Sequence, residues 1–474
     1  MSVKKRLEIS KFNNFDANSN LVKADKFYNY LPTEQLNNSM GVKVATFPKM
    51  ENDLTEEPLN FAGAGITSIE GVAYFKQYFP NSGVSTHRLL IYGNDKKVYI
   101  NEMFCKDFNL FWLYNLTFNY APITLSFKKN DTDAIILTDK EQMKVWKTNY
   151  SPSTIENVPV ITSMCMNEGE LFCTIQEPAF KIWHTSDLDA EKVGELNNVS
   201  GYISLEDDLG YARKVVTFDE NVYVFRDYGI SKISKYQKGF NVSQVYLSNT
   251  MIYSSTVSVC GNMLFFMTNE GIYSFNGVKV NRVNERISKM LSGNNEKAVG
   301  SSLGNKYYLA VRLNFEDEKK VLCEKGSCVN NAVIVFDIAD NSYEIIRGID
   351  VKSLLPIRTE CFEKMLCTFN TLHNDKLGEF VSVAECFEKN LPKFWLSKNL
   401  FEDYSLKIIT KLTVLADKDV KFKIIYDGKE MSVTTYRTGL NEFCFKISGK
   451  EIKLEISSSA KSSIVKNVVL DYYE

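Results

Sequence analysis

The chain has 474 residues, and 56 lysines and arginines against 58 aspartates and glutamates leave a formal net charge of −2. A chain of this length can bury a large core, and a charge this near zero excludes a global electrostatic clamp on nucleic acid, although a local basic face stays open. The 31 phenylalanines and 25 tyrosines, set against only 10 prolines, favour β-strands over disorder.

The N-terminal part differs from the rest of the chain. Met1–Arg6 is basic but no apolar segment follows it, so we expect no secretory signal. Residues 1–60 show no strand rhythm and many Asn, Lys and Asp, which predicts an extended arm that packs on the rest of the chain or on a neighbour. No window approaches 18 consecutive apolar residues, so we predict no membrane span. The ten scattered cysteines favour reduced thiols and synthesis in a cytoplasm.

Residues 61–400 repeat one unit, in which two strand-like runs are joined by a polar turn. The closing run of each unit ends in an aromatic residue, at Tyr99, Trp146, Trp183, Phe225, Phe275 and Phe336. Repeats of roughly 40–50 residues with about four strands each are typical of propeller blades. We therefore predict an all-β fold with a β-propeller of about six blades, with five or seven as alternatives. The irregular spacing keeps a two-sheet sandwich of unrelated hairpins open.

Helical periodicity is scarce, and the best candidate is the short segment Asn284–Leu291, which ends near Gly293. The C-terminal part, residues 401–474, contains alternating strand-like runs broken by turns such as Asp427-Gly428. Six short strands in about 70 residues predict a small antiparallel β-sandwich. The predicted strands are 406–415, 420–426, 431–435, 442–447, 451–457 and 463–472.

Residues that might carry catalysis or bind a metal do not form a recognised pattern. His184 is followed by Thr185 and Asp187, but it closes a predicted strand, where Thr and Asp commonly form turns. The cysteine pairs 323/328 and 361/367 lack histidines at zinc-site spacing. The acidic segments 131–133 and 337–341 lack the full calcium-loop pattern. We therefore predict a protein that is not an enzyme and has no cofactor and no metal site.

One basic stretch interleaves lysines with aromatic residues between residues 232 and 240. Lys232, Lys235 and Lys238 could follow a polyanion through phosphate contacts, while the neighbouring rings stack on bases. The alternative is the solvated face of an ordinary strand. These three lysines are the candidate DNA contacts of the chain.

The most specific motif is Gly271, Tyr273, Phe275 and Gly277, which follows the apolar run Met263–Met267 across a polar turn. Two strands and a second turn at Asn276-Gly277 predict a hairpin. Together with Arg286-Ile287 downstream, this pattern resembles the central blade of propeller proteins in tailed-phage virions. There the motif reads as a strand, Asp/Glu-Gly-Ile-Tyr, an aromatic residue and Asp/Asn-Gly, followed by a short helix.

Other segments are similar to the same family, the tail hub or nozzle proteins of short-tailed phages, also described as packaged-DNA stabilisation proteins. Residues 226–233 resemble the preceding blade, and residues 395–398, 426–428 and 437–441 are similar to the closing module. The resemblance covers residues 60–474 as a rhythm with one good motif. The chain departs from the family at its N-terminus, where a glycine-rich opening motif is expected.

The resemblance implies a structural virion protein that forms a closed ring, usually a hexamer, beneath the portal and adaptor. Such a ring extends the DNA channel, retains packaged double-stranded DNA and passes it on at ejection. The implied partners are further copies of the chain, the portal and adaptor and other tail proteins. The implied location is the neck or tail of the virion, after assembly in the host cytoplasm.

Two alternatives stay open. The first is a carbohydrate-binding or receptor-binding tail protein with a lectin-like C-terminal domain, in which exposed Trp146, Trp183 and Trp395 stack on sugars. The second is a cellular propeller that acts as a protein-interaction platform.

Overall fold

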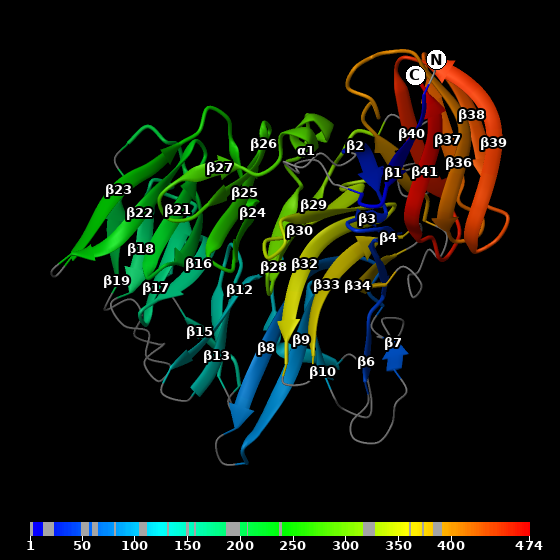
Figure 1. Cartoon of the computed structure of the whole chain (residues 1–474). Coiled ribbons are helices and arrows are strands. Elements are labelled where there is room, and N and C mark those ends of the chain that lie inside the picture. The colour runs from blue at the N-terminus through cyan, green and yellow to red at the C-terminus, as the bar shows by residue number, and fades with distance from the viewer. Residues whose placement is uncertain are drawn as a thin grey trace. The chain divides into compact units, whose positions relative to one another are not determined.

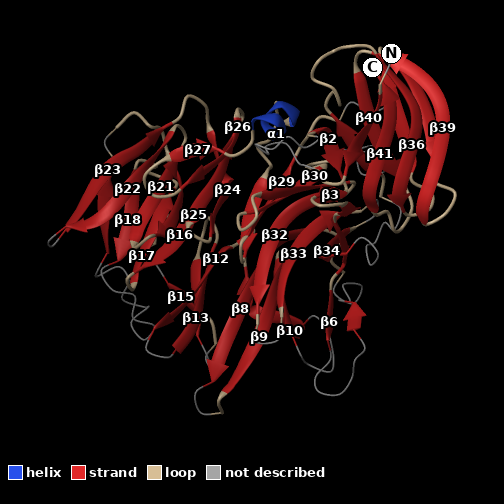
Figure 2. Ribbon diagram, in the orientation of Figure 1, coloured by secondary structure: helices blue, strands red, loops and turns tan. Residues whose placement is uncertain are grey.

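The structure of the chain is a computed structural model. It describes residues 3–12, 23–48, 56–58, 65–79, 82–103, 111–129, 132–147, 151–155, 158–185, 200–205, 207–236, 239–315, 328–359, 362–371, 374–382 and 391–474. Within these residues nearly all regular structure is β-strand (Figure 2). The chain divides into two compact units. Unit 1 comprises residues 1–43, 319–349 and 380–474, and unit 2 comprises residues 44–318 and 350–379.

Unit 2 contains, within its described part, five antiparallel sheets that are each built from four consecutive strands (Figure 1). The first is β8 (Ile69–Phe79), β9 (Val84–Gly93), β10 (Lys97–Met103) and β11 (Phe111–Thr117). The second is β12 (Ile123–Lys129), β13 (Thr132–Thr138), β14 (Met143–Lys147) and β15 (Ser153–Ile155). The third is β16 (Ile161–Asn167), β17 (Glu170–Ile175), β18 (Lys181–Thr185) and β19 (Ser200–Ser204).

The fourth sheet is β20 (Ala212–Phe218), β21 (Asn221–Arg226), β22 (Gly229–Tyr236) and β23 (Gly239–Leu247). The fifth is β24 (Ile252–Cys260), β25 (Met263–Thr268), β26 (Gly271–Phe275) and β27 (Val280–Arg282), and the short helix α1 (Glu285–Met290) follows it. Further strands of this unit are β6 (Thr46–Pro48), β7 (Glu56–Pro58), β28 (Val299–Leu303), β29 (Lys306–Val311), β32 (Asp350–Arg358), β33 (Glu363–Asn370) and β34 (Asp375–Ser382).

The first strands of consecutive sheets in unit 2 contact one another in sequence. β8, β12, β16, β20, β24, β28 and β32 each contact the next strand of this series, and β32 contacts β8, which closes the ring. Four-stranded antiparallel sheets whose first strands form a closed ring are the architecture of a β-propeller. The all-β fold and the propeller predicted from the sequence are therefore confirmed.

Side-chain hydroxyl groups connect neighbouring first strands of this ring. Three donate to the adjacent first strand: Ser126 Oγ to the Tyr74 carbonyl at 3.2 Å, Thr217 Oγ1 to the Met166 carbonyl at 2.5 Å, and Ser302 Oγ to Ser258 Oγ at 2.8 Å. Ser255 Oγ donates to the carbonyl of Ala298, the residue just before β28, at 2.6 Å. Small hydroxyl residues let two strands approach closely while their polar atoms stay paired.

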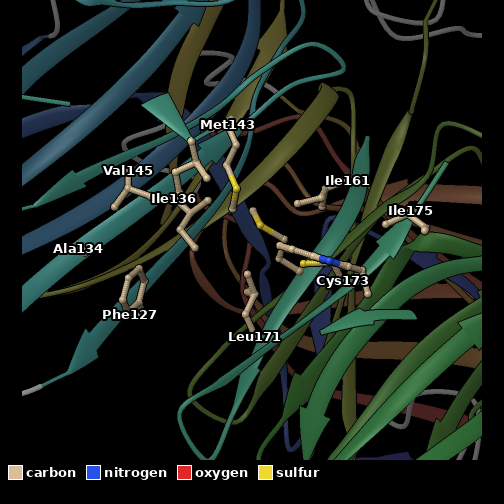
Figure 3. Close-up of a cluster of buried hydrophobic side chains, with 12 residues drawn as sticks. Phe127, Ala134, Ile136, Met143, Val145, Ile161, Leu171, Cys173 and Ile175 are labelled. Carbon is tan, nitrogen blue, oxygen red and sulfur yellow. The ribbon is translucent and has the colours of Figure 1, made fainter. Parts of the chain in front are cut away.

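Apolar side chains fill the junctions between adjacent sheets. Between the β12–β15 sheet and the β16–β19 sheet, one cluster joins Ile136 and Val145 to Leu171 and Trp183, all nearly fully buried (Figure 3). A single sheet would leave these faces in water, so burial at the junction stabilises both sheets.

Unit 1 is built from both ends of the chain. One sheet has the order β3 (Tyr30–Pro32), β4 (Leu36–Asn38), β41 (Val465–Tyr473), β36 (Lys407–Ala416) and β39 (Gly439–Gly449), with β1 (Lys4–Ile9) also paired to β41. The other has the order β2 (Ala24–Tyr28), β35 (Lys393–Ser397), β40 (Ile452–Ser458), β37 (Lys421–Tyr426) and β38 (Lys429–Thr434). This unit also holds β5 (Met40–Val44) and the hairpin β30 (Ala332–Asp337) and β31 (Ser342–Arg347).

The six strands predicted for residues 401–474 are confirmed as β36–β41. The expectation for residues 1–60 was an extended arm without strand rhythm, whereas β1, β2, β3 and β4 are hydrogen-bonded members of the two sheets. β1, β2 and β4 pair with strands some 370 to 470 positions further along the chain, so no local pattern indicates these pairings. β3 pairs with β4 in a local hairpin, but each of its strands has only three residues.

Candidate functional site

The motif Gly271–Gly277 forms the predicted hairpin between β25 and β26. Thr268 pairs with Gly271 and Leu264 pairs with Phe275. The Phe275 ring is fully buried and meets the Tyr223 ring edge-on, with the centroids 5.3 Å apart. Gly277 has a φ of +89°, in the left-handed region that glycine occupies without strain. The motif residues therefore shape the blade and its turn.

Gly271 has a second requirement, which comes from the helix after the blade. A Cβ atom at this position would lie 2.5 Å from Ser288 Oγ of α1 and 2.7 Å from Arg282 Nε of β27. The helix itself starts where Asn284 Oδ1 accepts hydrogen bonds from the backbone N–H groups of Arg286 and Ile287, at 2.9 and 3.1 Å. The predicted short helix is thus confirmed over Glu285–Met290.

The candidate basic stretch lies on β22, the third strand of its sheet. Lys235 Nζ forms ion pairs with Glu168 at 2.8 Å and Glu170 at 3.4 Å, and the hydrogen bond to Glu168 raises the pKa of Lys235. Lys232 Nζ lies 5.9 Å from the centre of the Tyr223 ring. Lys238 lies outside the described residues. The two described lysines thus sit away from the first strands that form the ring.

A lysine that the sequence analysis did not single out lies on a first strand instead. Lys214 of β20 donates from Nζ to the carbonyl oxygen of Val257 in β24 at 2.9 Å. Burial lowers the pKa of Lys214 to about 8. Its place between Arg213 and Val215 gives no sequence signal, because lysines on exposed strands look the same.

His184 is packed among aromatic rings. The Phe240 ring lies 4.9 Å away edge-on and the Phe172 ring is stacked at 6.0 Å. Burial lowers the pKa of His184, and its Nδ1 atom has no hydrogen-bond partner among the described residues. Gly201 lies directly against the imidazole, since a Cβ there would be 2.8 Å from Nε2. Asp187, the carboxylate considered with it, lies outside the described residues.

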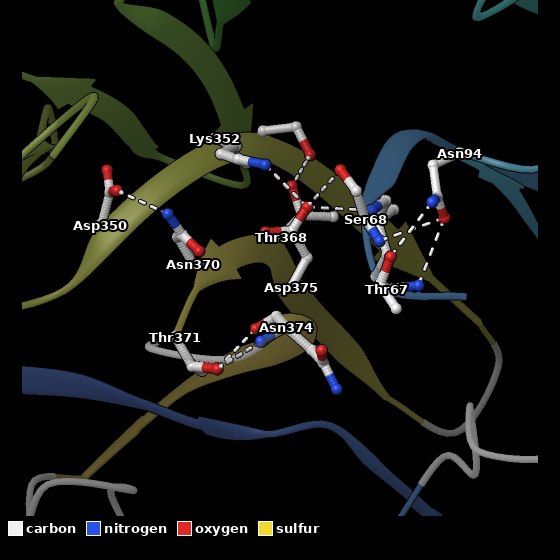
Figure 4. Close-up of polar contacts among 12 residues, drawn as sticks. Thr67, Ser68, Asn94, Asp350, Lys352, Thr368, Asn370, Thr371, Asn374 and Asp375 are labelled. Atoms are coloured by element: carbon white, nitrogen blue, oxygen red, sulfur yellow. Dashed lines mark hydrogen bonds and ion pairs between the residues drawn. The ribbon is translucent and has the colours of Figure 1, made fainter. Parts of the chain in front are cut away.

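A polar network joins the beginning of the β8–β11 sheet to β32 and β34 (Figure 4). Asp375 Oδ2 accepts hydrogen bonds from Ser68 Oγ at 3.0 Å and the Ile69 N–H at 2.9 Å, and it pairs with Lys352 Nζ at 2.7 Å. Asn94 Oδ1 accepts from the N–H groups of residues 67 and 68. The buried Asp375 carboxylate thus joins the start of β8 to Lys352 of β32 through three contacts, and we infer that this network stabilises the closure of the ring.

The remaining candidates have structural roles wherever the structure describes them. The three tryptophans considered for sugar stacking are buried: Trp146 is 7% exposed, Trp183 2% and Trp395 0%. The expectation that they are exposed is therefore wrong, because they pack in the junctions and in the unit 1 core. Asp337 and Asp340 accept hydrogen bonds from N–H groups two residues ahead, as in ordinary turns.

Cys165, Cys173 and Cys367 are buried, and Cys323 and Cys361, the predicted neighbours of Cys328 and Cys367, lie outside the described residues. No group of three or more His, Cys, Asp or Glu side chains in the described ranges could hold a metal ion. None of the described helices has the length and apolar character needed to span a bilayer.

The chain was compared with family models, curated proteins and solved structures. No family model matches the sequence, and no curated protein matches it. Among solved structures, PorZ, an essential bacterial surface component of the type-IX secretion system of Porphyromonas gingivalis, matches with 12% identity and a TM-score of 0.40 over 78% of this chain. The match covers 45% of PorZ, so the chain spans less than half of that protein's length.

A second match is Hsv2 of Kluyveromyces lactis, with 9% identity and a TM-score of 0.35 over 55% of this chain and 81% of Hsv2. Likeness at these scores carries no argument about function. The β-propeller architecture rests on the strand order and on the ring contacts described above.

Proposed function

We propose that the chain is a structural virion protein of a tailed phage, with the hub or nozzle role of the family that it resembles. In this proposal the chain forms a hexameric ring in the neck or tail that extends the DNA channel, retains packaged DNA and transmits it at ejection. The observation that carries the proposal is the motif unit of β25, β26 and α1. Gly271 packs against Ser288 and Arg282, so the glycine and the following helix form one packed structural unit.

We further infer that the propeller has seven blades. The support is the closed series of seven first strands, β8, β12, β16, β20, β24, β28 and β32. The sequence predicts six blades because six closing aromatic residues occur in the repeats, and none of these six lies on β34. Seven blades with filled junctions make a stiff body, which suits a protein that carries mechanical load in a virion.

In this proposal DNA passes the protein with weak contacts. Lys235 is already paired with Glu168 and Glu170, so its charge is largely neutralised locally. Lys232 and Lys238 complete the candidate DNA contacts. No chemical step belongs to the proposed role, and no cofactor is needed for it.

The test is assembly and location. The full chain is purified and its mass is measured by sedimentation, and virions of the phage that encodes it are probed with an antibody against the chain. We expect a ring-sized oligomer and a signal in tail or neck fractions. A chain that stays monomeric and never co-purifies with virions or tail parts would contradict the proposal.

The second candidate, a propeller that acts as a protein-interaction platform, is favoured by a specific surface. Phe180, Tyr202 and Tyr211 are 45%, 56% and 54% exposed. Lys181 Nζ lies 5.9 Å from the centres of both the Phe180 and Tyr202 rings, and Arg213 lies 5.1 Å from the Tyr211 ring. Exposed Tyr and Arg side chains are typical of binding hot spots.

The same loops are connected by backbone hydrogen bonds, so these side chains share one surface. The Ala212 N–H donates to the Ala179 carbonyl at 2.8 Å, and the Leu205 N–H donates to the Phe180 carbonyl at 2.9 Å. If this candidate is right, the double variant Tyr202→Ser with Tyr211→Ser loses a partner captured by the wild-type chain from its host, while virion fractions contain no chain at all.

A further inference from the structure

The outer strand of the fourth sheet, β23, is an open sheet edge. It is the last strand of its sheet and pairs only with β22 among the described residues (Figure 1). β23 has nine residues, whereas the outer strands β11, β15, β19 and β27 of the other four sheets have three to seven. At roughly 3.3 Å per residue it offers an edge about 30 Å long.

The sequence of β23, Gly-Phe-Asn-Val-Ser-Gln-Val-Tyr-Leu, contains no charged residue and no proline. Proteins usually protect long edges with charges, prolines or short strands, because unpaired N–H and C=O groups attract another strand. Two of the outer strands of unit 1 follow that rule. β38 carries Lys429 and Glu430, and β39 carries Glu442 and Lys446.

The register between β22 and β23 defines the part of the edge that can pair. It is regular from Gly239 to Gln244 and shifts by one residue beyond Gln244. Asn241, Ser243 and Gln244 are exposed on this stretch. A regular stretch of six residues is long enough to add a strand by main-chain hydrogen bonds.

We propose that β23 is the contact between two copies of this chain, which pair their β23 strands antiparallel about a two-fold axis. In such a contact each side chain near the two-fold axis lies opposite the same residue of the other copy. A charged residue there would therefore face a like charge. The absence of charge along β23 is what this contact requires. A site for a different protein would gain specificity from opposite charges, which β23 does not offer.

The exposed apolar side chains at the two ends of β23 also favour a second copy of this chain as the partner. Tyr236 is 65% exposed and pairs in the hairpin with Gly239, and Leu247 at the other end of β23 is 61% exposed. An antiparallel contact places the Gly239 end of one strand beside the Leu247 end of the other. Since Gly239 has no side chain, the Tyr236 ring can reach across it to the partner's Leu247, and the two-fold axis repeats this contact.

The contact is independent of the proposed virion role and is tested on the full purified chain by sedimentation velocity over a concentration series. We expect the wild type to associate as its concentration rises. Ser243→Lys places two like charges near the axis and is expected to weaken association at least about tenfold. The matched control is Ser432→Lys on β38, an exposed serine on an edge that already carries charge, and it leaves association unchanged.

A second pair of variants keeps the test independent of the edge backbone. Tyr236→Ser and Leu247→Ser each remove one side of the apolar end contact and are expected to weaken association, with thermal unfolding unchanged because both side chains are exposed. A wild type that is monomeric at every concentration overturns the proposal. So does an oligomer that Ser243→Lys leaves intact, or one that Ser432→Lys weakens equally.

Discussion

The sheets of unit 2 and those of unit 1 are assembled in opposite ways. In unit 2 each complete sheet consists of four strands that follow one another in the chain, as β16–β19 do within residues 161–204. In unit 1 the sheet that contains β35 pairs Phe27 with Trp395 and Trp395 with Ile456. Local hairpins set the register in the first case, whereas the second needs segments separated by most of the chain.

The two units also use different polar contacts. In unit 2 hydroxyl groups bridge neighbouring first strands, and one aspartate network fastens the ring. In unit 1 charges gather at the ends of β1, β36 and β41. Lys407, whose side chain is 1% exposed, pairs with Asp403 at 2.7 Å and Glu474 at 2.5 Å. Closing a long loop costs conformational entropy, and these pairs together with the apolar core offset that cost.

The largest expected effect comes from a cavity in the non-local sheet. Trp395→Ala removes a fully buried side chain that meets the Phe12 ring edge-on at 5.3 Å. We expect a loss of about 3–5 kcal/mol in the free energy of unfolding, measured in urea. Hydrogen exchange should become faster in β2 and β40, which flank β35. Trp395→Phe is the control. If β2 stays protected from hydrogen exchange in Trp395→Ala, the role given to the pairing of β2 with β35 is contradicted.

The counterpart in the local sheets is Leu171→Ala. Leu171 is fully buried in the junction between the β12–β15 and β16–β19 sheets. The expected loss is about 2–4 kcal/mol, from the lost transfer free energy and the cavity. Exchange should accelerate in β16 and β18, its neighbours in the sheet, and in β13 across the junction. Leu171→Met keeps the volume and should cost little. Faster exchange in β2 would show that the destabilisation caused by Leu171→Ala is not confined to the local sheets.

This comparison also explains what could be predicted from the sequence. The hairpin of the Gly271 motif, helix α1 and the six C-terminal strands are local patterns, and all were found. Blade closure was harder to read because Tyr99, Trp146, Trp183 and Phe275 lie on third strands, whereas Phe225 lies on the second strand of its sheet. That displacement made the spacing irregular.

The candidate site shows the same limit. The lysines of β22 stand out by composition, but the pairing of Lys235 with Glu168 and Glu170 joins two sheets and has no sequence signature. Aromatic content predicted strands correctly, yet it could not tell an exposed tryptophan from one in a junction, because burial depends on the neighbouring sheet. Lys214 was missed for that reason too.

The next prediction is that unit 1 is sensitive to acid through the Lys407 cluster. Hydrogen bonds from Lys407 and then Ser405 lower the pKa of Asp403 to about 2, and bonds from Lys407 and then Lys5 lower the pKa of Glu474. Because the folded pKa values lie below the unfolded ones, this stabilisation is complete above about pH 5 and is lost as the pH falls toward 2. The effect should be smaller than that of either cavity, since both carboxylates are partly exposed.

Lys407→Met tests this by urea unfolding between pH 7 and pH 3, with hydrogen exchange of β36 and β41 as the local readout. We expect a lower midpoint at pH 7 and a flatter dependence on acid than in the wild type. The matched control is Lys411→Met on the same strand, which removes an exposed pair with Glu442 and keeps the acid dependence. An acid dependence that Lys407→Met leaves unchanged would assign it to other carboxylates.

The last prediction is the alkaline counterpart in unit 2. Lys214 donates to a carbonyl and pairs with no carboxylate among the described residues, and burial lowers its pKa to about 8 from the usual 10.5. Between these values the unfolded chain binds more protons than the folded chain, so the free energy of unfolding rises with pH from about 8 to about 10.5. Lys214→Met should remove that rise, whereas Lys232→Met on the same sheet should keep it. A buried lysine with carboxylate partners therefore makes the stability of unit 1 rise with pH in the acid range, and one without them makes the stability of unit 2 rise with pH in the alkaline range. A rise that persists in Lys214→Met would break this contrast.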